Sequence, residues 1–374
     1  MNGIAAYDSI PTLNYNGSIA ETNLEKANLL AKNYAKTSST INYNQNFLNY
    51  IKDNNVKNNP QIITNGINSE IEMLNEQFDI NELKQAIRSA KNNKSPGDDG
   101  LPYELLKHLH KNALKIMLNF YNNIWEGGKM PKDWHHAIIL PLLKPGKIPS
   151  NPESYRPISL TPTICKVMET MVTKRLQWFL EKNNLISKSQ SGFRKHRCTS
   201  DQILKLQDTI LKKLKNKEHV LAIFIDFERA YDMLHVPTLL KKIQNLGIVG
   251  NTYDWVENFL SHRSFQVKVG TELSDTFLQE NGTPQGSVIS PLLFLLMIND
   301  IPNGIDGVEM SLFADDSAIY VGHRNVKILK HKIQSSMNLI NDWCNKNSFK
   351  ISINKTTGVL FSKRNNLSKI DIKI

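Results

Sequence analysis

The chain has 374 residues, of which 40% are hydrophobic and 22% charged, a composition that indicates a folded globular protein and excludes a disordered or collagen-like one. Its net charge of +11 favours polyanionic partners such as nucleic acid. Three scattered cysteines without a Cys-x-x-Cys pair argue against a disulfide scaffold and a cysteine-rich zinc site, and they suit a reducing, intracellular environment. The sequence shows neither a secretory signal peptide nor an apolar run near the roughly 20 residues of a membrane span.

Residues 1–80 are rich in asparagine and contain few apolar anchors. Leu24, Ala27, Leu30 and Tyr34 recur at helical spacing within residues 21–37, which predicts one amphipathic helix. The polar run 53–60 ends in Asn-Pro and predicts a linker. We therefore expect residues 1–80 to form a poorly packed leader with one helix.

The part from residue 81 to residue 215 mixes helical and strand patterns. A helix begins near Asn81, with Asp79 or Asn81 as its cap, and ends at the turn-rich loop 94–100. The other elements expected here are one or two helices over 103–125, helices over 163–180 and 201–214, and a buried strand over 137–143.

The part from residue 216 to residue 374 contains the densest strand signal, the continuous apolar run 220–225, which is typical of a strand buried on both faces. Strands over 308–313 and 317–321 flank Ala314-Asp315-Asp316 and predict a hairpin. We also expect helices near Pro237 and over 290–298 and 328–344, a half-exposed strand over 265–269, and two short strands within 350–362. This order of helices and strands predicts an α+β fold.

Three carboxylates stand at positions where a charge is costly unless it is exposed, paired or bound to metal. Asp226 directly follows the apolar run, and Asp315 and Asp316 lie at the predicted hairpin tip. Hard divalent cations such as Mg²⁺ bind one or two carboxylates together with substrate phosphates. Adjacent aspartates are also ordinary turn chemistry, but together with Asp226 they favour a metal site.

A glycine-containing segment, Gly282-Thr283-Pro284-Gln285-Gly286-Ser287, precedes the apolar helix over 290–298. Glycine lets a backbone approach a ligand closely, and a helix N-terminus favours anions. The segment lacks the Lys-Ser/Thr ending of a P-loop, so by itself it is also compatible with an ordinary loop before a helix.

Three segments, in their order along the chain, resemble the reverse transcriptase domain of non-LTR (LINE-type, jockey-like) retrotransposons. They are Phe224-Ile225-Asp226-Phe227-Glu228-Arg229-Ala230-Tyr231, the segment 282–291 and Phe313-Ala314-Asp315-Asp316. Three upstream segments agree with that family: Ser95–Gly100 resembles its template-side loop, and 154–160 and 190–194 resemble its fingers motifs. The resemblance covers roughly residues 81–362, which is most of the chain.

The resemblance implies a right-hand polymerase fold with fingers and a palm whose antiparallel sheet is flanked by helices. We expect residues 81–215 to belong to the fingers and 216–374 to the palm, with fingers elements returning within 236–280. Because the chain ends at Ile374, soon after the last palm motif, it resembles a fragment without the family's thumb and endonuclease.

By the same resemblance, Asp226 and Asp315 bind two Mg²⁺ ions, or Mn²⁺ as the alternative, with Asp316 beside them and the backbone of Phe227 as a further ligand. The backbone amides of Phe227 and Glu228 are expected to face the triphosphate of the incoming dNTP.

The remaining implied sites surround the dNTP, the DNA primer and the RNA template. Arg156 and Lys144 are expected to contact the triphosphate, Tyr231 to exclude a 2′-hydroxyl, Gln285 to lie against the nascent base pair, and Lys355 to protonate pyrophosphate as a general acid. Ser95, Gly97, Arg194 and Gly286 are expected to contact template or primer. Arg156, Lys144 and Lys355 are each also compatible with an ordinary solvated side chain on the surface.

These features predict an RNA-directed DNA polymerase that acts in the nucleus and cytoplasm, without a membrane partner. The alternatives are a truncated, inactive remnant that only binds nucleic acid and an RNA-dependent RNA polymerase. That second family has a carboxylate five residues after the first metal aspartate and a glycine before Asp-Asp, where this chain has Tyr231 and Ala314. A relative of group II intron enzymes is a more distant alternative.

Overall fold

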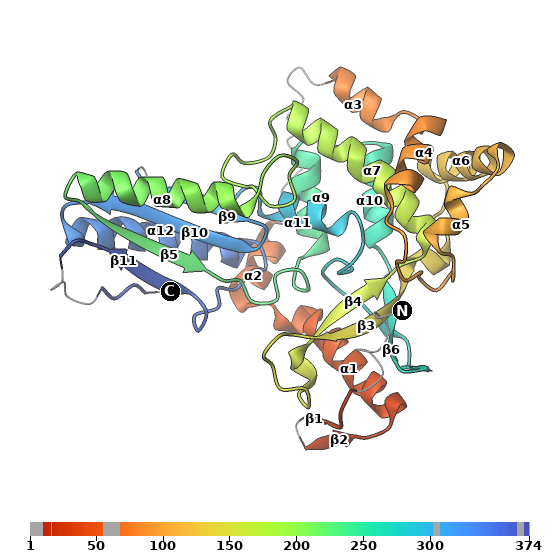
Figure 1. Cartoon of the computed structure of the whole chain (residues 1–374), viewed down its shortest axis with the longest axis horizontal. Coiled ribbons are helices and arrows are strands. Elements are labelled where there is room, and N and C mark those ends of the chain that lie inside the picture. The colour runs from red at the N-terminus through yellow and green to blue at the C-terminus, as the bar shows by residue number, and fades with distance from the viewer. Residues whose placement is uncertain (1–9, 16, 55–67, 302–306, 365–369, 374) are drawn as a thin grey trace. The chain divides into compact units, whose positions relative to one another are not determined.

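The computed structural model describes residues 10–15, 17–54, 68–301, 307–364 and 370–373, and the chain divides into two compact units. The first unit comprises segments 1–42, 60–183 and 240–290, and the second comprises 43–59, 184–239 and 291–374. Both units combine helices with a sheet, which confirms the α+β class (Figure 1). Residues 184–215 belong to the second unit and residues 240–290 to the first, whereas the assignment of fingers and palm to these parts stays a prediction.

The sheet of the first unit has the order β4-β3-β6-β7, with β8 also paired to β6. Its strands are β3 (His136–Leu143), β4 (Tyr155–Leu160), β6 (Ser264–Val269), β7 (Glu272–Leu273) and β8 (Phe277–Leu278). β3 pairs antiparallel with β4 and parallel with β6, with Ile139 opposite both Ser159 and Val267. The predicted strands over 137–143 and 265–269 are confirmed as β3 and β6.

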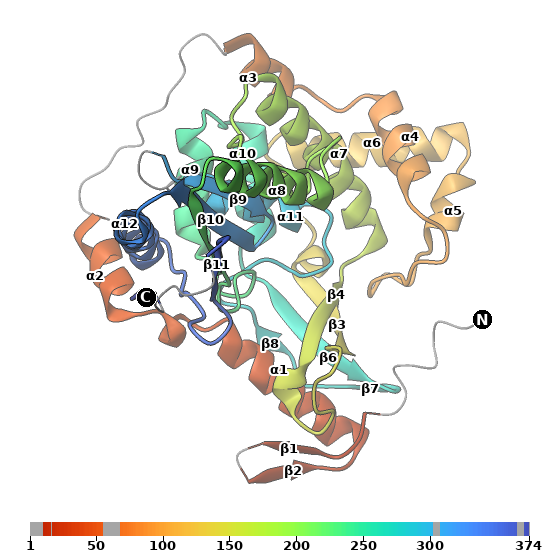
Figure 2. The same ribbon diagram turned by 60° about the vertical axis from the view of Figure 1, so that its left-hand side comes forward.

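The N-terminal segment packs on this sheet, contrary to the expectation of a poorly packed leader. The predicted helix is α1 (Asn23–Thr37), which begins at a capping box between Thr22 and Glu25. Its buried Leu30 and Ala31 share a core with Phe265 and Val267 of β6, and the hairpin of β1 (Leu13–Tyr15) and β2 (Ser18–Ala20) lies beside it (Figure 2). Local periodicity finds an amphipathic helix but not the sheet that its apolar face covers.

Residues 38–80 contain more structure than the single helix predicted for the leader. The short helix η1 (Thr40–Asn42) is followed by α2 (Gln45–Asn54), which belongs to the second unit, and by α3 (Asn68–Asn75), which belongs to the first. Residues 55–60 of the predicted linker lie outside the described residues.

The first unit also has helices other than α1 and α3. It contains α4 (Ile80–Ser89), α5 (Tyr103–Lys107), α6 (Lys111–Trp125), η2 (Lys132–His135), η3 (Pro152–Ser154), α7 (Thr163–Lys182) and α10 (Asn251–Leu260). Asp79 caps α4 through a capping box with Glu82, as one of the two expected caps. The predicted helix over 103–125 forms as two helices, α5 and α6, which was one of the two expected outcomes.

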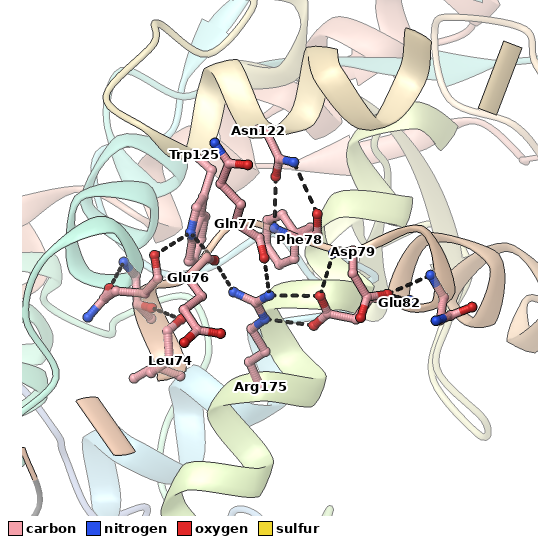
Figure 3. A network of polar contacts seen from close by, with 12 residues as sticks. Leu74, Glu76, Gln77, Phe78, Asp79, Glu82, Asn122, Trp125 and Arg175 are labelled. Carbon is pink, nitrogen blue, oxygen red and sulfur yellow. Dashed lines mark hydrogen bonds and ion pairs between the residues drawn. The ribbon is translucent and has the colours of Figure 1, made fainter. Parts of the chain in front are cut away.

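Arg175 of α7 fixes the turn between α3 and α4 (Figure 3). Its guanidinium donates two hydrogen bonds of 2.7 Å to the carboxylate of Glu82, a third of 2.8 Å to the Gln77 carbonyl and a fourth to the Glu76 carbonyl. The same group lies 4.3 Å from the ring centre of Phe78. The guanidinium is planar and carries five N–H donors, so the single side chain of Arg175 can bind a carboxylate and two carbonyls at once and join α7 to the turn.

The sheet of the second unit is antiparallel throughout, with the order β11-β5-β10-β9 (Figure 1). Its strands are β5 (His219–Ile225), β9 (Glu309–Phe313), β10 (Asp316–His323) and β11 (Thr357–Phe361). The predicted buried strand and hairpin are confirmed as β5 and as β9–β10. Of the two short strands expected within 350–362, only β11 forms, and Ile351 makes an isolated bridge to Phe227.

Helices cover both faces of this sheet. On one face α8 (Thr199–Lys215) packs Leu206 and Ile210 over Val220, Ala222 and Tyr320. On the other face α12 (Val326–Lys346) contacts β5 and β10, as both views show (Figures 1 and 2). α9 (Val236–Asn245) and α11 (Ser290–Ile298) each contain the point where the chain passes between the units. Among the described residues, no helix has the length and apolarity to cross a membrane.

Candidate active site

The fold of the second unit brings together carboxylates that are distant in sequence. Asp226 directly follows β5, and Asp315 lies in the two-residue turn between β9 and β10. β5 and β10 are paired with Ser317 opposite Ile225, so the next position along the ladder places Asp316 opposite Asp226. All three aspartates therefore lie at one end of the same sheet.

The charges of these aspartates act on one another. The pKa of Asp316 is raised above its usual value, first by desolvation and then by the negative charges of Asp315 and Asp226. One carboxylate oxygen of Asp226, Oδ2, is buried and accepts no hydrogen bond from the described residues, although Lys355 Nζ lies 3.1 Å from it. Repulsion between like charges and an unsatisfied oxygen are both relieved when a cation binds.

The donor set fits a hard divalent cation. Carboxylate oxygens are the ligands that Mg²⁺ prefers, and Mg²⁺ sites use one or two carboxylates and complete their coordination with water or phosphate. Within the described residues, no three His, Cys, Asp or Glu side chains are arranged as a preformed metal-binding cluster.

The backbone that follows Asp226 is paired with the segment before β11. The Asp226 carbonyl accepts a hydrogen bond of 2.8 Å from the Ser352 amide, and the Glu228 amide donates one of 2.8 Å to the Lys350 carbonyl. The Glu228 amide is therefore occupied within the chain, which corrects the expectation that it faces a triphosphate. The role of the Phe227 backbone stays a prediction, and its side chain is buried against Phe349.

Tyr231 lies beside the carboxylates. Its ring stacks on Phe294 with a centroid separation of 4.3 Å and an angle of 17°. Burial raises its pKa first, and the charge of Asp315 raises it further, so the phenol is near that aspartate and stays protonated. A rigidly held aromatic ring therefore lies near Asp315, and its part in sugar selection stays a prediction.

Lys355 reaches Asp226 from the turn before β11. The Lys355 and Thr356 amides both donate to the Ser352 carbonyl, at 3.2 and 2.9 Å, and the Asp226 amide donates to Thr356 Oγ1 at 3.3 Å. The turn and the end of β5 thus hold each other in place. The ammonium of Lys355 forms an ion pair with Asp226, and its role as a proton donor stays a prediction.

A cavity of about 390 Å³ adjoins these groups inside the second unit. Asp226, Asp316 and Lys355 supply charged side chains to its lining, and Ile203, Leu206, Phe224, Leu312, Phe313 and Ala318 are among its apolar lining residues. Its volume lies within the range of ligand pockets.

The first unit positions the two candidate triphosphate contacts differently. Arg156 of β4 is exposed and lies opposite Leu142 of β3. Lys144, just after β3, donates from Nζ to the Glu153 carbonyl at 2.9 Å. Contacts of Arg156 and Lys144 with a triphosphate stay predictions.

The segment 282–287 docks on β4. The Gln285 carbonyl accepts a hydrogen bond of 2.6 Å from the Ser159 amide. Gly286 has φ +117°, and a Cβ there would lie 2.7 Å from the Ser159 carbonyl oxygen, so only glycine fits. The structure thereby places Gln285 and Gly286 on the strand that carries Arg156.

Glu169 of α7 anchors the same segment and was not anticipated from the sequence. It is fully buried and accepts hydrogen bonds from the Val288 amide at 2.7 Å and the Ile289 amide at 3.3 Å, just before α11. The signal for it was a carboxylate within the apolar spacing of 163–180, since a buried acid requires partners.

The other predicted contacts lie in loops that the chain itself holds. Gly97 lies against the Thr161 carbonyl, and Ser95 is exposed. Arg194 donates from Nη1 to the Ser187 and Gln190 carbonyls, both at 3.1 Å, so part of its guanidinium is used to shape its own loop. Contacts of these residues with template or primer stay predictions.

Each unit therefore collects part of the predicted site. The second unit unites Asp226, Asp315, Asp316, Tyr231 and Lys355. The first unit unites Arg156 with Gln285 and Gly286 on β4.

Comparisons with known proteins agree with this geometry. Residues 142–369 match the family described as reverse transcriptase (RNA-dependent DNA polymerase). The chain is 30% identical over 292 residues to the RNA-directed DNA polymerase from mobile element jockey of Drosophila melanogaster, a match that covers 76% of this chain and 32% of that protein. It is 31% identical over 290 residues to the probable RNA-directed DNA polymerases from transposon BS and transposon X-element of the same species, with the same coverage.

The chain thus spans about a third of the length of these relatives. The matches confirm the resemblance to non-LTR retrotransposon proteins that the ordered motifs indicated. On this basis, the chain belongs to the reverse transcriptase family.

Proposed function

We propose that this chain carries the nucleotidyl-transfer centre of an RNA-directed DNA polymerase, which joins a dNTP to the 3′-hydroxyl of a DNA primer on an RNA template. The observation that carries the proposal is the meeting of Asp226, Asp315 and Asp316 at one end of an antiparallel sheet, where their charges raise the pKa of Asp316. Membership of the reverse transcriptase family supports it.

The family implies the right-hand polymerase fold. In that fold the second unit, with its four-stranded sheet between α8 and α12, serves as the palm. The first unit supplies fingers elements, including β3 and β4. This assignment follows the compact units, so residues 184–215 go with the palm and residues 240–290 with the fingers.

Asp226, Asp315 and Asp316, with the Phe227 backbone, would hold the divalent ions. Reverse transcriptases generally use such ions, and two Mg²⁺ ions supply activation of the primer hydroxyl and stabilisation of the leaving pyrophosphate. The protein's own contribution is mainly placement, because phosphoryl transfer asks little covalent chemistry of side chains. The paired backbones of residues 226–228 and 350–352 keep Asp226 in position.

The surrounding residues would bind and select the nucleotide. Arg156 grips the triphosphate, for which its guanidinium offers parallel hydrogen bonds. Tyr231 excludes the 2′-hydroxyl of a ribonucleotide by steric bulk, because its ring is locked against Phe294. Gln285 and Gly286 lie against the nascent base pair, and Lys355 donates a proton to pyrophosphate.

Two readouts test the metal assignment. In primer extension on an RNA template with Mg²⁺ and dNTPs, Asp315→Asn should lower the rate by at least about a hundredfold, because each carboxylate stabilises charge in the transition state. Mn²⁺ binding followed by electron paramagnetic resonance should weaken in parallel, whereas affinity for the RNA–DNA duplex should not change.

Asp208→Asn is the matched control, since Asp208 is an exposed aspartate of α8 that pairs only locally with Lys212. It should behave as the wild-type chain in every readout. An Asp315→Asn chain that binds Mn²⁺ and extends primers like the wild type would refute the assignment.

The sugar-selecting role has a separate test. Tyr231→Ala should raise ribonucleotide incorporation relative to deoxynucleotide incorporation, and Tyr231→Phe should not, because it keeps the ring on Phe294. Equal discrimination by the alanine variant and the wild type would remove this role from Tyr231.

A further inference from the structure

The turn that carries Asp315 has an unusual backbone. Ala314, which immediately precedes the two aspartates, is buried and has φ +56°, in the left-handed region. Hairpin turns usually place Gly, Asn or Asp at such positions, because a side chain with a Cβ is disfavoured there. A strained residue next to a functional group persists only when its surroundings hold it in place.

The side-chain amide of Gln190 holds both backbone polar groups of this residue. Gln190 Oε1 accepts a hydrogen bond from the Ala314 amide at 3.1 Å and another from the Gly192 amide at 2.7 Å. Its Nε2 donates to the Ala314 carbonyl at 3.5 Å. Only an amide side chain offers an acceptor and donors in this arrangement, and Gln190 is 2% exposed.

The backbone around Gln190 is docked on β9. Gln190 forms a parallel bridge with Leu312, through hydrogen bonds of 2.9 Å from the Ser191 amide to the Leu312 carbonyl and from the Leu312 amide to the Ser189 carbonyl. A Cβ at Gly192 would lie 2.2 Å from the Ala314 nitrogen, so the segment can approach the turn only with glycine there. The segment 189–192 therefore clamps the strand and the turn together.

We infer that Gln190 is a positioning residue for the metal-binding carboxylates: it fixes the left-handed backbone of Ala314 and so sets the direction of Asp315 and Asp316. This inference rests on the proposed function. It gives the segment 190–194, which resembles a fingers motif of the family, a role at the carboxylates themselves. Gln190 touches no substrate in this role and acts only through the turn.

The test compares Gln190→Leu with Asp315→Asn in Mn²⁺ titrations followed by electron paramagnetic resonance. Gln190→Leu keeps the side-chain volume and removes all three hydrogen bonds, so the Mn²⁺ dissociation constant should rise about tenfold. In primer extension kcat should fall by a similar factor, with KM for dNTP changed less than about twofold. Adding Ala314→Gly should recover part of the Mn²⁺ affinity, because glycine adopts the left-handed backbone without Gln190.

Gln202→Leu is the matched control. Gln202 donates to Ser189 and Ser191 of the same segment but not to the turn, so its loss should change Mn²⁺ affinity less than about twofold. If Gln190→Leu does not fold, as judged by circular dichroism, Gln190→Glu replaces it, since a carboxylate keeps both accepted hydrogen bonds and loses only the donor.

Gln190→Glu should lie between the wild type and Asp315→Asn in Mn²⁺ affinity. The inference would be overturned if the folded Gln190 variant bound Mn²⁺ as tightly as the wild type. It would also be overturned if Gln202→Leu lost as much Mn²⁺ affinity as the Gln190 variant. If Asp315→Asn itself leaves Mn²⁺ binding unchanged, the proposed function fails instead, so the two failures are distinguishable.

Discussion

Lys355 offers a sharp test because its removal should affect metal binding and catalysis in opposite directions. Its Nζ lies 3.1 Å from Asp226 Oδ2, a buried oxygen of one of the proposed metal-binding carboxylates. In Lys355→Met this competing cation is gone, so a divalent ion should bind more tightly. The same change removes the proposed proton donor for pyrophosphate, so primer extension should slow.

The size of the first effect follows from exposure. The side chains of Lys355 and Asp226 are 67% and 36% exposed, so the ion pair is screened by solvent. Exposed pairs of this kind are worth about 0.2–1 kcal/mol, which corresponds to an increase in metal affinity of up to about fivefold. Loss of a general acid typically costs about 10²–10⁴ in rate.

Mn²⁺ titration and single-turnover primer extension measure the two effects on the same preparation. Lys350→Met is the matched control, because Lys350 makes a comparable exposed ion pair of 3.3 Å with Glu228 rather than with Asp226. The control should change neither quantity by more than about twofold. Two results would show that the ion pair with Asp226 does not compete with the metal: weaker Mn²⁺ binding in Lys355→Met, or a gain in Mn²⁺ affinity in Lys350→Met equal to that in Lys355→Met.

Three further predictions concern packing and pH. Arg175→Met should lower the free energy of unfolding by about 3 kcal/mol in urea denaturation, since it breaks a largely buried ion pair, and the cost should shrink in a Glu82→Gln background. Burial lowers the pKa of His235 from 6.5 to about 4. The neutral ring should therefore contribute its full stability above pH 6.5, and the free energy of unfolding should fall by up to about 3 kcal/mol as the pH drops toward 4. A His235→Phe chain that keeps this pH dependence would contradict the assignment. Glu169→Gln should raise KM for dNTP with little change in Mn²⁺ affinity, because it weakens the hydrogen bond to Val288 that anchors the segment 282–287; equal KM values would exclude this role.

The sequence by itself determined the elements that bear the carboxylates. An apolar run of six residues can only be a strand or a buried helix segment, and its length and β-branched content select the strand that became β5. The turn at Ala314 and Asp315 was readable because apolar strands flank it on both sides. The role of the three aspartates came from the family's ordered motifs, because periodicity carries no information about which strand ends meet.

Only the tertiary structure decided what supports these residues. Hydrogen bonds from Ala314 to Gln190 and from Val288 to Glu169 join positions more than a hundred residues apart, and no local pattern specifies such partners. The leader and the Glu228 amide were misjudged for the same reason: each is committed to a sheet or strand segment that lies elsewhere in the sequence. Local propensity acts over a few residues, whereas burial and hydrogen-bond pairing are settled when distant segments pack.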